Sequence, residues 1–267
     1  MRMLSKLPSL ANVAPGSTAT LNCPIGRSYD RIILEYTGVT LAQMKNLRVE
    51  LDGKPIQEFK DAVQLNDLNK YYGRFEAAGF ITIWFNRPEM NTLEHQRVTR
   101  LGTGAGGQGV VQTFQISFDV DSAATAPVVR AHAVQSEASP LGMITKVKQF
   151  VFSSATAGQF EIDSIPRGPR ILAVHCFKSD VTAVEVEQNS RKIREGSKEL
   201  LEFLQQESGR APMTAKATTI DFTQEADLYH SLETRPDFIR DQRFRLSLAT
   251  PGEVRVVVEY LDHLPGI

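Results

Sequence analysis

Two pairs of carboxylates have the spacing that places both side chains on one face of a β-strand. Asp119 and Asp121 are two residues apart, and so are Glu185 and Glu187. Successive side chains of a strand point to opposite faces, so residues two apart present their oxygens together. Oxygen ligands of this kind suit Ca²⁺. The sequence therefore makes Asp119 and Asp121 candidate calcium ligands, with solvated carboxylates at a strand end as the alternative.

A glycine-rich segment at residues 102–107 matches the dinucleotide-binding pattern G-x-G-x-x-G. That pattern binds phosphate when it follows a strand and opens a helix, because the helix N-terminus then faces the ligand. Here residues 110–114 follow, and their sequence, VVQTF, is typical of a strand. We therefore expect a flexible hairpin loop and no cofactor-binding residues.

The remaining residues with reactive side chains are scattered. The five histidines are too far apart for H-E-x-x-H or H-x-H, and no G-x-S-x-G nucleophile motif is present. His175 lies in an apolar run and is expected in the core. Cys23 and Cys176 also lie in apolar runs, so we expect buried free thiols, with a single disulfide as the alternative. The sequence predicts no catalytic residues. The histidines are His95, His132, His175, His230 and His263.

Composition is that of an ordinary folded protein. The chain has 267 residues, 42% hydrophobic and 23% charged, with a formal net charge of -1. A charge so close to zero argues against broad electrostatic binding to nucleic acid or to an anionic membrane, and no direct binding of nucleic acid is expected. No apolar run is long enough to span a bilayer as a helix, and Lys6 and Pro8 interrupt the apolar residues at the start, so no secretory signal is expected.

Short stretches of alternating or β-branched residues predict a chain made mostly of strands. Turn signals separate them, such as Asp52-Gly53, which favours a tight hairpin. Helices are expected only at residues 59–68 and at 197–204, where Ser197 can cap and Leu200, Leu201 and Leu204 share a face. This pattern predicts an all-β sandwich or barrel. The expected strands are residues 29–36, 47–51, 80–85, 111–118, 159–162, 170–177, 182–187, 217–222, 243–248 and 254–260.

The two halves of the chain resemble each other at an offset between 137 and 142 residues. An offset that stays so narrow over the whole length predicts two copies of one β domain of about 130 residues. The alternative is two unrelated β domains that share a generic alternation. The matching positions are Arg31 with Arg170, Val49 with Val186, Phe85 with Phe222, Gly26 with Gly168 and Asp121 with Asp262.

Short motifs in the same order along the chain resemble the major capsid proteins of corticovirus-type bacteriophages, which are tailless and icosahedral with an internal membrane. This resemblance implies an all-β fold of two tandem eight-stranded jelly-roll sandwiches, a double jelly roll. The expected segments are an N-terminal arm at 1–10, a first jelly roll at 11–124, a linker at 125–141 and a second jelly roll at 142–267. Among the motifs are Pro24-Ile25-Gly26, Val49-Glu50-Leu51-Asp52-Gly53, Arg87-Pro88-Glu89-Met90, Phe118-Asp119-Val120-Asp121, Ile165-Pro166-Arg167 and Val258-Glu259-Tyr260.

The resemblance also implies a function without catalysis. The chain is expected to be a structural major capsid protein of a virion, forming pseudo-hexagonal homotrimers that tile an icosahedral shell over a membrane. Assembly is expected in the bacterial host cytoplasm, with vertex and membrane-associated virion proteins as further partners and calcium as an optional cofactor. The apolar residues of the arm, beside Arg2 and Lys6, suggest contact with lipid or neighbouring subunits, with a disordered terminus as the alternative.

Two other functions use the same fold. A carbohydrate-binding, lectin-like module would display exposed aromatic side chains, but Trp84 lies between Ile83 and Phe85 and is expected in the core. A metal-dependent enzyme of the cupin type would need clustered histidines, which the sequence lacks.

Overall fold

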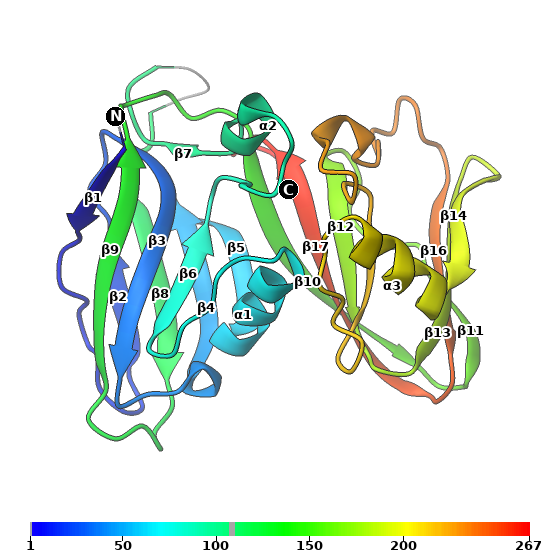
Figure 1. The fold of residues 1–267 in the computed structure, drawn as a ribbon, viewed down its shortest axis with the longest axis horizontal. Helices are drawn as coiled ribbons and strands as arrows, with labels where there is room; N and C mark the ends of the chain where they lie inside the picture. Colours follow the sequence, from blue (N-terminus) through cyan, green and yellow to red (C-terminus); the bar gives the residue numbers. More distant parts are fainter. Residues whose placement is uncertain (1, 107–109) are drawn as a thin grey trace. The chain divides into compact units, whose positions relative to one another are not determined.

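The computed structural model describes residues 2–106 and 110–267 and consists mainly of strands in two compact units, Met1–Val147 and Lys148–Ile267 (Figure 1). The end of the predicted glycine loop, Gly107, lies outside the described residues. Within them, no helix is both long enough and apolar enough to cross a membrane.

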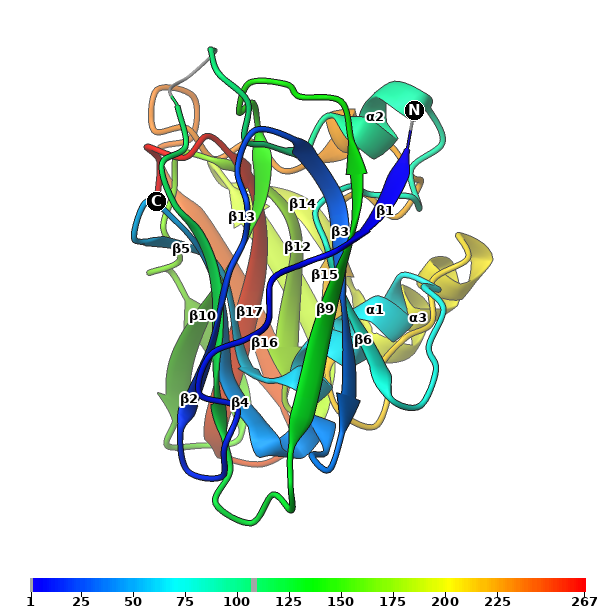
Figure 2. The same cartoon turned by 90° about the vertical axis from the view of Figure 1, so that its left-hand side faces the viewer.

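The first unit contains a five-stranded antiparallel sheet and a second set of four antiparallel strands. Consecutive strands switch repeatedly between the sheets, which is the connectivity of a jelly roll. Figure 2 shows β1, β9 and β3 of one sheet side by side. That sheet has the order β1 (Met3–Lys6), β9 (Val128–Ser136), β3 (Ser28–Thr37) and β6 (Phe80–Trp84), with the short β7 (Leu101–Gly102) also paired to β3; the other has the order β2 (Thr18–Asn22), β8 (Phe114–Val120), β4 (Met44–Leu51) and β5 (Lys54–Asp61).

The second unit repeats this order strand for strand. Strands β10 to β15 take the places of β1 to β6, a shift of nine in strand number. Strands β16 and β17 take the places of β8 and β9, a shift of eight, because the short β7 has no counterpart among the described strands. The predicted double jelly roll is therefore confirmed. One sheet has the order β10 (Ile144–Ser154), β17 (Gly252–Asp262), β12 (Arg170–Phe177) and β15 (Thr218–Asp221); the other has β11 (Gly158–Ile162), β16 (Gln242–Leu248), β13 (Val181–Gln188) and β14 (Arg191–Ser197).

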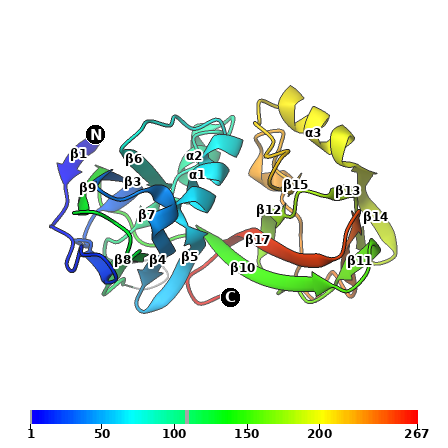
Figure 3. The ribbon, with the colours of Figure 1, turned by 90° about the horizontal axis from the view of Figure 1, so that it is seen from below.

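Helices lie at equivalent places in the two units. Helix α1 (Ala62–Tyr71) follows β5 and contacts β5 and β6, and α3 (Lys198–Glu207) follows β14 and contacts β13, β14 and β15 (Figure 3). As predicted, Ser197 caps α3, accepting a hydrogen bond from the Leu200 amide. The predicted apolar face is wrong in part, because Leu201 is buried while Leu200 is 49% exposed. Helix α1 begins later than predicted because β5 continues to Asp61, which caps it.

The exit from each helix is built in the same way. Gly73 and Gly209 have φ of 66° and 75°, the left-handed conformation that commonly ends helices. The next residue in each case is an arginine with a carboxylate partner. Arg74 pairs with Glu89 at 3.0 Å, and Arg210 pairs with Asp221 at 3.1 Å. The duplication is thus visible in detailed contacts as well as in strand order.

A second repeated contact ties each helix to the strand that follows. The side-chain amide of Asn69 in α1 donates to the carbonyl of Thr82 in β6, at 2.8 Å. The side-chain amide of Gln205 in α3 donates to the carbonyl of Thr219 in β15, at 2.7 Å. Both donors are buried, so each hydrogen bond replaces water that the amide loses on folding.

A third repeated contact fixes the entry to the strand after the Gly26 and Gly168 pair. Both glycines have positive φ, 99° and 127°. The Thr103 hydroxyl accepts from the Gly26 amide at 2.9 Å and donates to the Arg27 carbonyl. In the second unit the Thr234 hydroxyl accepts from the Gly168 amide at 2.9 Å and donates to the Pro169 carbonyl. We call these two threonines the clasp threonines.

One predicted match between the halves is wrong. Asp121 directly follows β8, whose counterpart is β16, whereas Asp262 is the last residue of β17, whose counterpart is β9. The connection between β6 and β8 is longer than that between β15 and β16, because it also contains α2 (Leu93–Arg97) and β7. The true offset therefore falls below the predicted range after this connection.

The predicted arm and linker are both parts of the first jelly roll. The segment 125–141 contains β9, which lies between β1 and β3. The segment 1–10 contains β1, which pairs with β9 from Met3 opposite Gln135 to Lys6 opposite His132. Alanine, serine and proline made 125–141 look like a linker, but its valines and alanines alternate as in a strand, with Val129, Ala131 and Ala133 buried.

Candidate functional site

The two candidate calcium ligands lie on the same side of β8 and its end, as their spacing predicts, but each already accepts hydrogen bonds. Asp119 accepts from the Thr18 hydroxyl at 2.6 Å and from the Asn46 amide group at 2.8 Å. Asp121 pairs with Lys45 at 2.5 Å and accepts from the Ala123 backbone amide. Protein donors therefore satisfy both carboxylates separately.

These donors stabilise the ionised carboxylates. The hydrogen bonds from Asn46 and Thr18 lower the pKa of Asp119, and those from Lys45 and the Ala123 amide lower the pKa of Asp121. Within residues 2–106 and 110–267, no group of three or more His, Cys, Asp or Glu side chains is arranged to hold a metal ion. Calcium binding at this pair stays a prediction.

The second carboxylate pair belongs to an ionic ladder across the outer face of one sheet. Arg245 of β16 contacts Glu185 and Glu187 of β13, the latter at 2.8 Å, and Glu161 of β11 at 2.7 Å. Lys192 of β14 contacts Glu185 from the other side at 2.7 Å. The hydrogen bonds from Lys192 and Arg245 lower the pKa of Glu185. Opposite charges on neighbouring strands make this a cross-strand stabilising network.

Residues with reactive side chains lie in structural positions. His175 is fully buried in β12, where its ring nitrogens are 2.9 Å from the Thr219 hydroxyl and 3.1 Å from a Glu259 carboxylate oxygen. Cys23 and Cys176 are buried and free, as predicted, and burial raises the pKa of each thiol to about 12. Thiols with so high a pKa are poor nucleophiles.

A buried charge network that the sequence reasoning missed surrounds the motif at residues 87–90. Glu89 pairs with Arg74 at 3.0 Å and with Arg87 at 3.1 Å, and all three side chains are at most 10% exposed. The guanidinium groups of both arginines lie 4.8 Å from the centre of the Tyr72 ring. Charged residues at 87 and 89, around Pro88, were the available signal, but sequence alone gave no reason to expect them inside.

Two models of known protein families match this chain, one in each half. The model described as the viral coat protein P2 N-terminal domain matches residues 4–136, and that of the viral coat protein P2 C-terminal domain matches residues 144–264. The chain belongs to the viral coat protein P2 family. These ranges agree with the placement of β1 and β9 in the first jelly roll.

One relative and two solved structures that resemble this P2 family protein are capsid proteins. The major capsid protein P2 of Pseudoalteromonas phage PM2 is 35% identical, with 98% of this chain and 97% of the relative covered. The crystal structure of P2 from bacteriophage PM2 matches with a TM-score of 0.93 at 33% identity, covering all of both chains. The STIV MCP structure matches with a TM-score of 0.71 at 12% identity over 99% and 98% of the chains, a likeness that shows the fold alone.

Membership in the P2 family makes this chain a structural viral coat protein. It distinguishes the chain from the lectin-like and enzymatic alternatives. Because a coat protein acts through extended interfaces, its functional features are sought on exposed surfaces.

Several large apolar side chains of this P2 family protein are exposed, and each unit has two of them on its helix or between that helix and the start of the next strand. In the first unit, Phe75 follows α1 and is 89% exposed, and Phe80 begins β6. In the second, Leu200 and Phe203 lie three residues apart on α3, and Phe203 is 62% exposed. We call these four residues the helix-side apolar groups. Exposed apolar side chains that gather in this way are typical of protein interfaces.

The expected core position of Trp84 is wrong. Ile83 and Phe85 are buried, but Trp84 points to the other face of β6 and is only partly buried, with Arg31 stacked 4.5 Å from its ring centre and Arg74 at 5.3 Å. The alternation of a strand separates neighbours in sequence onto opposite faces, so two core neighbours argue against a core position. Cation–π contacts already use this ring.

Proposed function

We propose that the chain forms homotrimers with a pseudo-hexagonal outline that tile the shell of the virion. Two copies of one jelly roll in each of three chains give six similar lobes, and six lobes around an axis can cover a flat facet. The observation that carries this proposal is the repeated strand order, together with the repeated contacts at each helix exit. Closed rings of identical chains are a common form of assembly.

The helix-side apolar groups support a specific interface. Each unit exposes them in the connection that leads from its second sheet into β6 or β15. Six lobes around a pseudo-sixfold axis would bring corresponding regions of the two units into similar contacts, and each unit exposes apolar groups at or just after its helix. Large aromatic residues at an interface centre commonly contribute most of its binding energy.

Changing Phe203 tests this interface. Phe203→Ser is expected to weaken association by about 2 kcal/mol or more, roughly thirtyfold, because a buried aromatic anchor is lost. The matched control is Phe238→Ser, since Phe238 is similarly exposed, at 60%, but lies outside these connections. Light scattering after size exclusion measures the mass against three times the 29.7 kDa of one chain. A monomeric wild-type chain, or equal loss in both variants, would contradict the proposed interface.

We also propose that the shell overlies an internal membrane and that the N-terminal strand contacts it. Arg2, Leu4 and Lys6 are alternate residues, all exposed, and Leu4 is 71% exposed. Two cations beside an apolar side chain suit an anionic lipid surface. Because β1 is part of a sheet, deleting it would damage the fold, so Leu4→Ser is the appropriate variant. Reduced flotation with phosphatidylglycerol vesicles supports the contact, and unchanged flotation contradicts it.

Further partners and the place of assembly follow the family resemblance. We propose contacts with vertex proteins and membrane-associated virion proteins, and assembly in the cytoplasm of a bacterial host. Cross-linking within purified particles, followed by mass spectrometry, tests the partners, and imaging of infected cells tests the site of assembly.

A further inference from the structure

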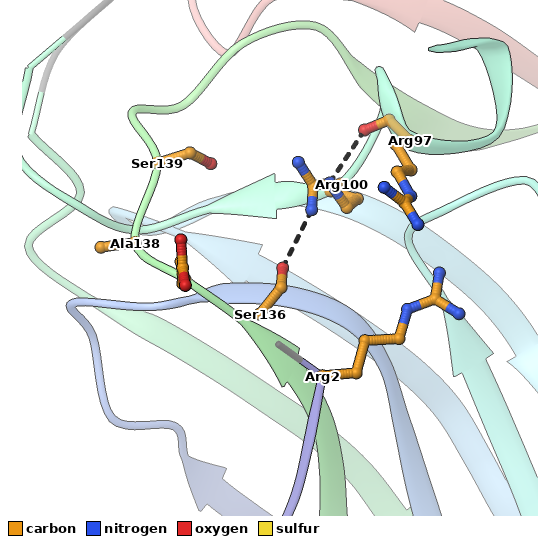
Figure 4. Close-up of a pocket in the computed structure, with 7 residues that line it drawn as sticks. Arg2, Arg97, Arg100, Ser136, Ala138 and Ser139 are labelled. Atoms are coloured by element: carbon orange, nitrogen blue, oxygen red, sulfur yellow. Dashed lines mark hydrogen bonds between the residues drawn. The ribbon is translucent and has the colours of Figure 1, made fainter. Parts of the chain in front are cut away.

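Three arginines converge on one pocket of the first unit, between α2 and the residues that follow β9. The pocket has a volume of about 400 Å³, and its lining includes Arg2, Arg97, Arg100, Ser136 and Ser139. Figure 4 shows the side chains of Arg2 and Arg97 pointing toward one another. Guanidinium groups repel at short range, so their convergence calls for an anion that offsets the repulsion.

Charges within the protein offset this cluster only in part. The Arg2 Nε lies 2.8 Å from a carboxylate oxygen of Asp30, whose side chain is 3% exposed. Glu137 also lines the pocket but is exposed and takes part in an interaction of its own. Among the described residues, the Arg97 guanidinium has no hydrogen-bond or ion-pair partner. One full positive charge therefore faces the pocket unpaired.

Hydrogen bonds within the protein also hold several hydrogen-bond donors of the pocket in place. Arg100 donates from Nη1 to the Ser136 hydroxyl at 3.0 Å and from Nε to the Arg97 carbonyl at 3.2 Å, which fixes its guanidinium group (Figure 4). Ser136 is 8% exposed, and with its oxygen accepting from Arg100, its hydroxyl proton can be donated to a ligand. The Ser139 hydroxyl is held by the Ser28 hydroxyl at 2.6 Å.

A neighbouring arginine supports a positive potential around Arg2. Burial, and then the positive charge of Arg2, lower the pKa of Arg31. Arginine offers a planar fork of donors that matches the oxygens of phosphate, and hydroxyl groups complete such sites. A carboxylate would use two donors, whereas this pocket provides three guanidinium groups and a hydroxyl.

We propose that the pocket of Arg2, Arg97, Arg100 and Ser136 binds a phosphate group, carried either by a free phosphate compound or by the headgroup of an anionic phospholipid. The binding of inorganic phosphate by the purified chain does not rest on the proposed trimer or shell.

The first experiment measures binding of inorganic phosphate to the full chain by calorimetry at low ionic strength. Arg97→Gln is expected to weaken binding about tenfold, the value of one charge-assisted hydrogen bond. Because Arg97 has no partner to lose within the described structure, the variant is expected to fold normally, which its melting temperature checks. Arg191→Gln is the matched control, since it removes the same charge from an exposed position on β14.

Arg100→Lys separates geometry from charge. Lysine keeps the charge but loses the forked donors, so weaker binding in this variant supports a positioned site. Absence of saturable phosphate binding overturns the proposal. Equal weakening by Arg97→Gln and Arg191→Gln overturns it as well, because that result is the signature of non-specific charge attraction.

The second experiment distinguishes the two sources of phosphate. Vesicles of phosphatidylglycerol and of phosphatidylcholine are floated with the wild-type chain and with Arg97→Gln. Binding to phosphatidylglycerol that Arg97→Gln reduces and inorganic phosphate inhibits supports a lipid headgroup. Binding of inorganic phosphate in calorimetry, without such inhibition on vesicles, supports a free phosphate compound.

Discussion

The two jelly rolls have the same strand order but differ on the outer face of one sheet. In the second unit that face, on β11, β16, β13 and β14, carries the ionic ladder centred on Arg245. In the first unit the equivalent face carries mainly hydroxyl and amide contacts, in which Asp119 accepts from Thr18 and Asn46, and Gln115 donates to Asn22 at 3.3 Å. Its ion pair of Lys45 with Asp121 lies at the end of β8 and does not extend into a ladder. Buried residues are constrained by packing, whereas outward residues are free to diverge after a duplication.

The units differ again in the connection that leads to β8 or β16. In the first unit it contains α2 and β7 and contributes Arg97 and Arg100 to the phosphate pocket. In the second it contains the short 3-10 helix η2 (Leu228–His230). Both keep a clasp threonine. Thus the contacts that build the fold occur in both units. Within the described residues, the arginine-lined pocket occurs only in the first unit, because the longer connection before β8 supplies two of its arginines.

The largest effect is expected where a buried arginine loses its carboxylate. Glu89→Gln in the first unit and Asp221→Asn in the second should each lower the free energy of unfolding by about 3–5 kcal/mol, because an uncompensated charge remains buried. Urea unfolding of the full chain measures this. Glu253→Gln, in the exposed pair of Glu253 with Arg255, is the control and should change little. A small effect in one unit alone would break the equivalence of the two helix exits.

The clasp threonines should give a smaller and matched effect. Thr103→Val and Thr234→Val keep the side-chain shape but remove the hydroxyl that the glycine amide and a carbonyl use. We expect a loss of about 1–2 kcal/mol in each case. The same urea measurement, with Thr182→Val at an exposed strand position as control, checks it. No loss in either variant would show that the repeated contact is not a stabilising one.

Whether a structural element could be predicted from the sequence depends on the contacts that form it. The alternation of apolar and polar residues located β13 and β16, and a continuous apolar run located β12. Asp52-Gly53 was correctly identified as a turn, with φ of 50° and 72°. By contrast, β1 and β9 were missed because short runs rich in alanine or interrupted by polar residues have little strand signal, and their pairing is long-range. The buried ion pairs of Arg74 and Arg210 with their carboxylates could not be predicted, because charged residues in a sequence normally indicate the protein surface.

Functional features likewise fall into those that the sequence predicts and those that only the folded structure shows. The family could be identified from short motifs. The position of Trp84 was missed, although the alternation of a strand places it on the face opposite to Ile83 and Phe85. The phosphate pocket joins residues 2, 97, 100 and 136, and such a grouping exists only after folding. Its single sequence signal, Arg97 and Arg100 three residues apart, is common on surfaces.

A weaker effect is expected from the outer faces. Arg245→Gln should lower the melting temperature more at low salt than at high salt, because the ladder is partly exposed and ions screen it. Asp119→Asn should depend less on salt, since its partners Thr18 and Asn46 are neutral. Fluorimetric melting in a salt series measures both. Equal salt dependence would remove the contrast between the faces.

The acid side of the stability curve gives the next test. Hydrogen bonds from Arg235 lower the pKa of Glu233 from 4.5 to about 2. The folded state therefore holds this proton less tightly than the unfolded state, so the pair stabilises above pH 4.5 and its contribution is lost as the pH falls toward 2. Glu233→Gln should reduce the loss of stability in that window and leave the slope above pH 5 unchanged. An unchanged acid limb would contradict the pairing.

Calcium gives the smallest expected effect. If Asp119 and Asp121 bind the ion, added Ca²⁺ should raise the melting temperature of the wild-type chain, and a chelator should reverse the rise. Asp121→Asn should abolish this response. Since Lys45 already pairs with Asp121, the response is expected to be small. Absence of calcium uptake in calorimetry would exclude the pair as a site.

Electron-microscopic class averages of the purified oligomer, viewed along its symmetry axis, test the central claim most directly. The account predicts a ring of six similar lobes from three chains, with small alternating differences where the two units diverge. Three lobes, a twofold outline or single two-lobed particles would contradict it.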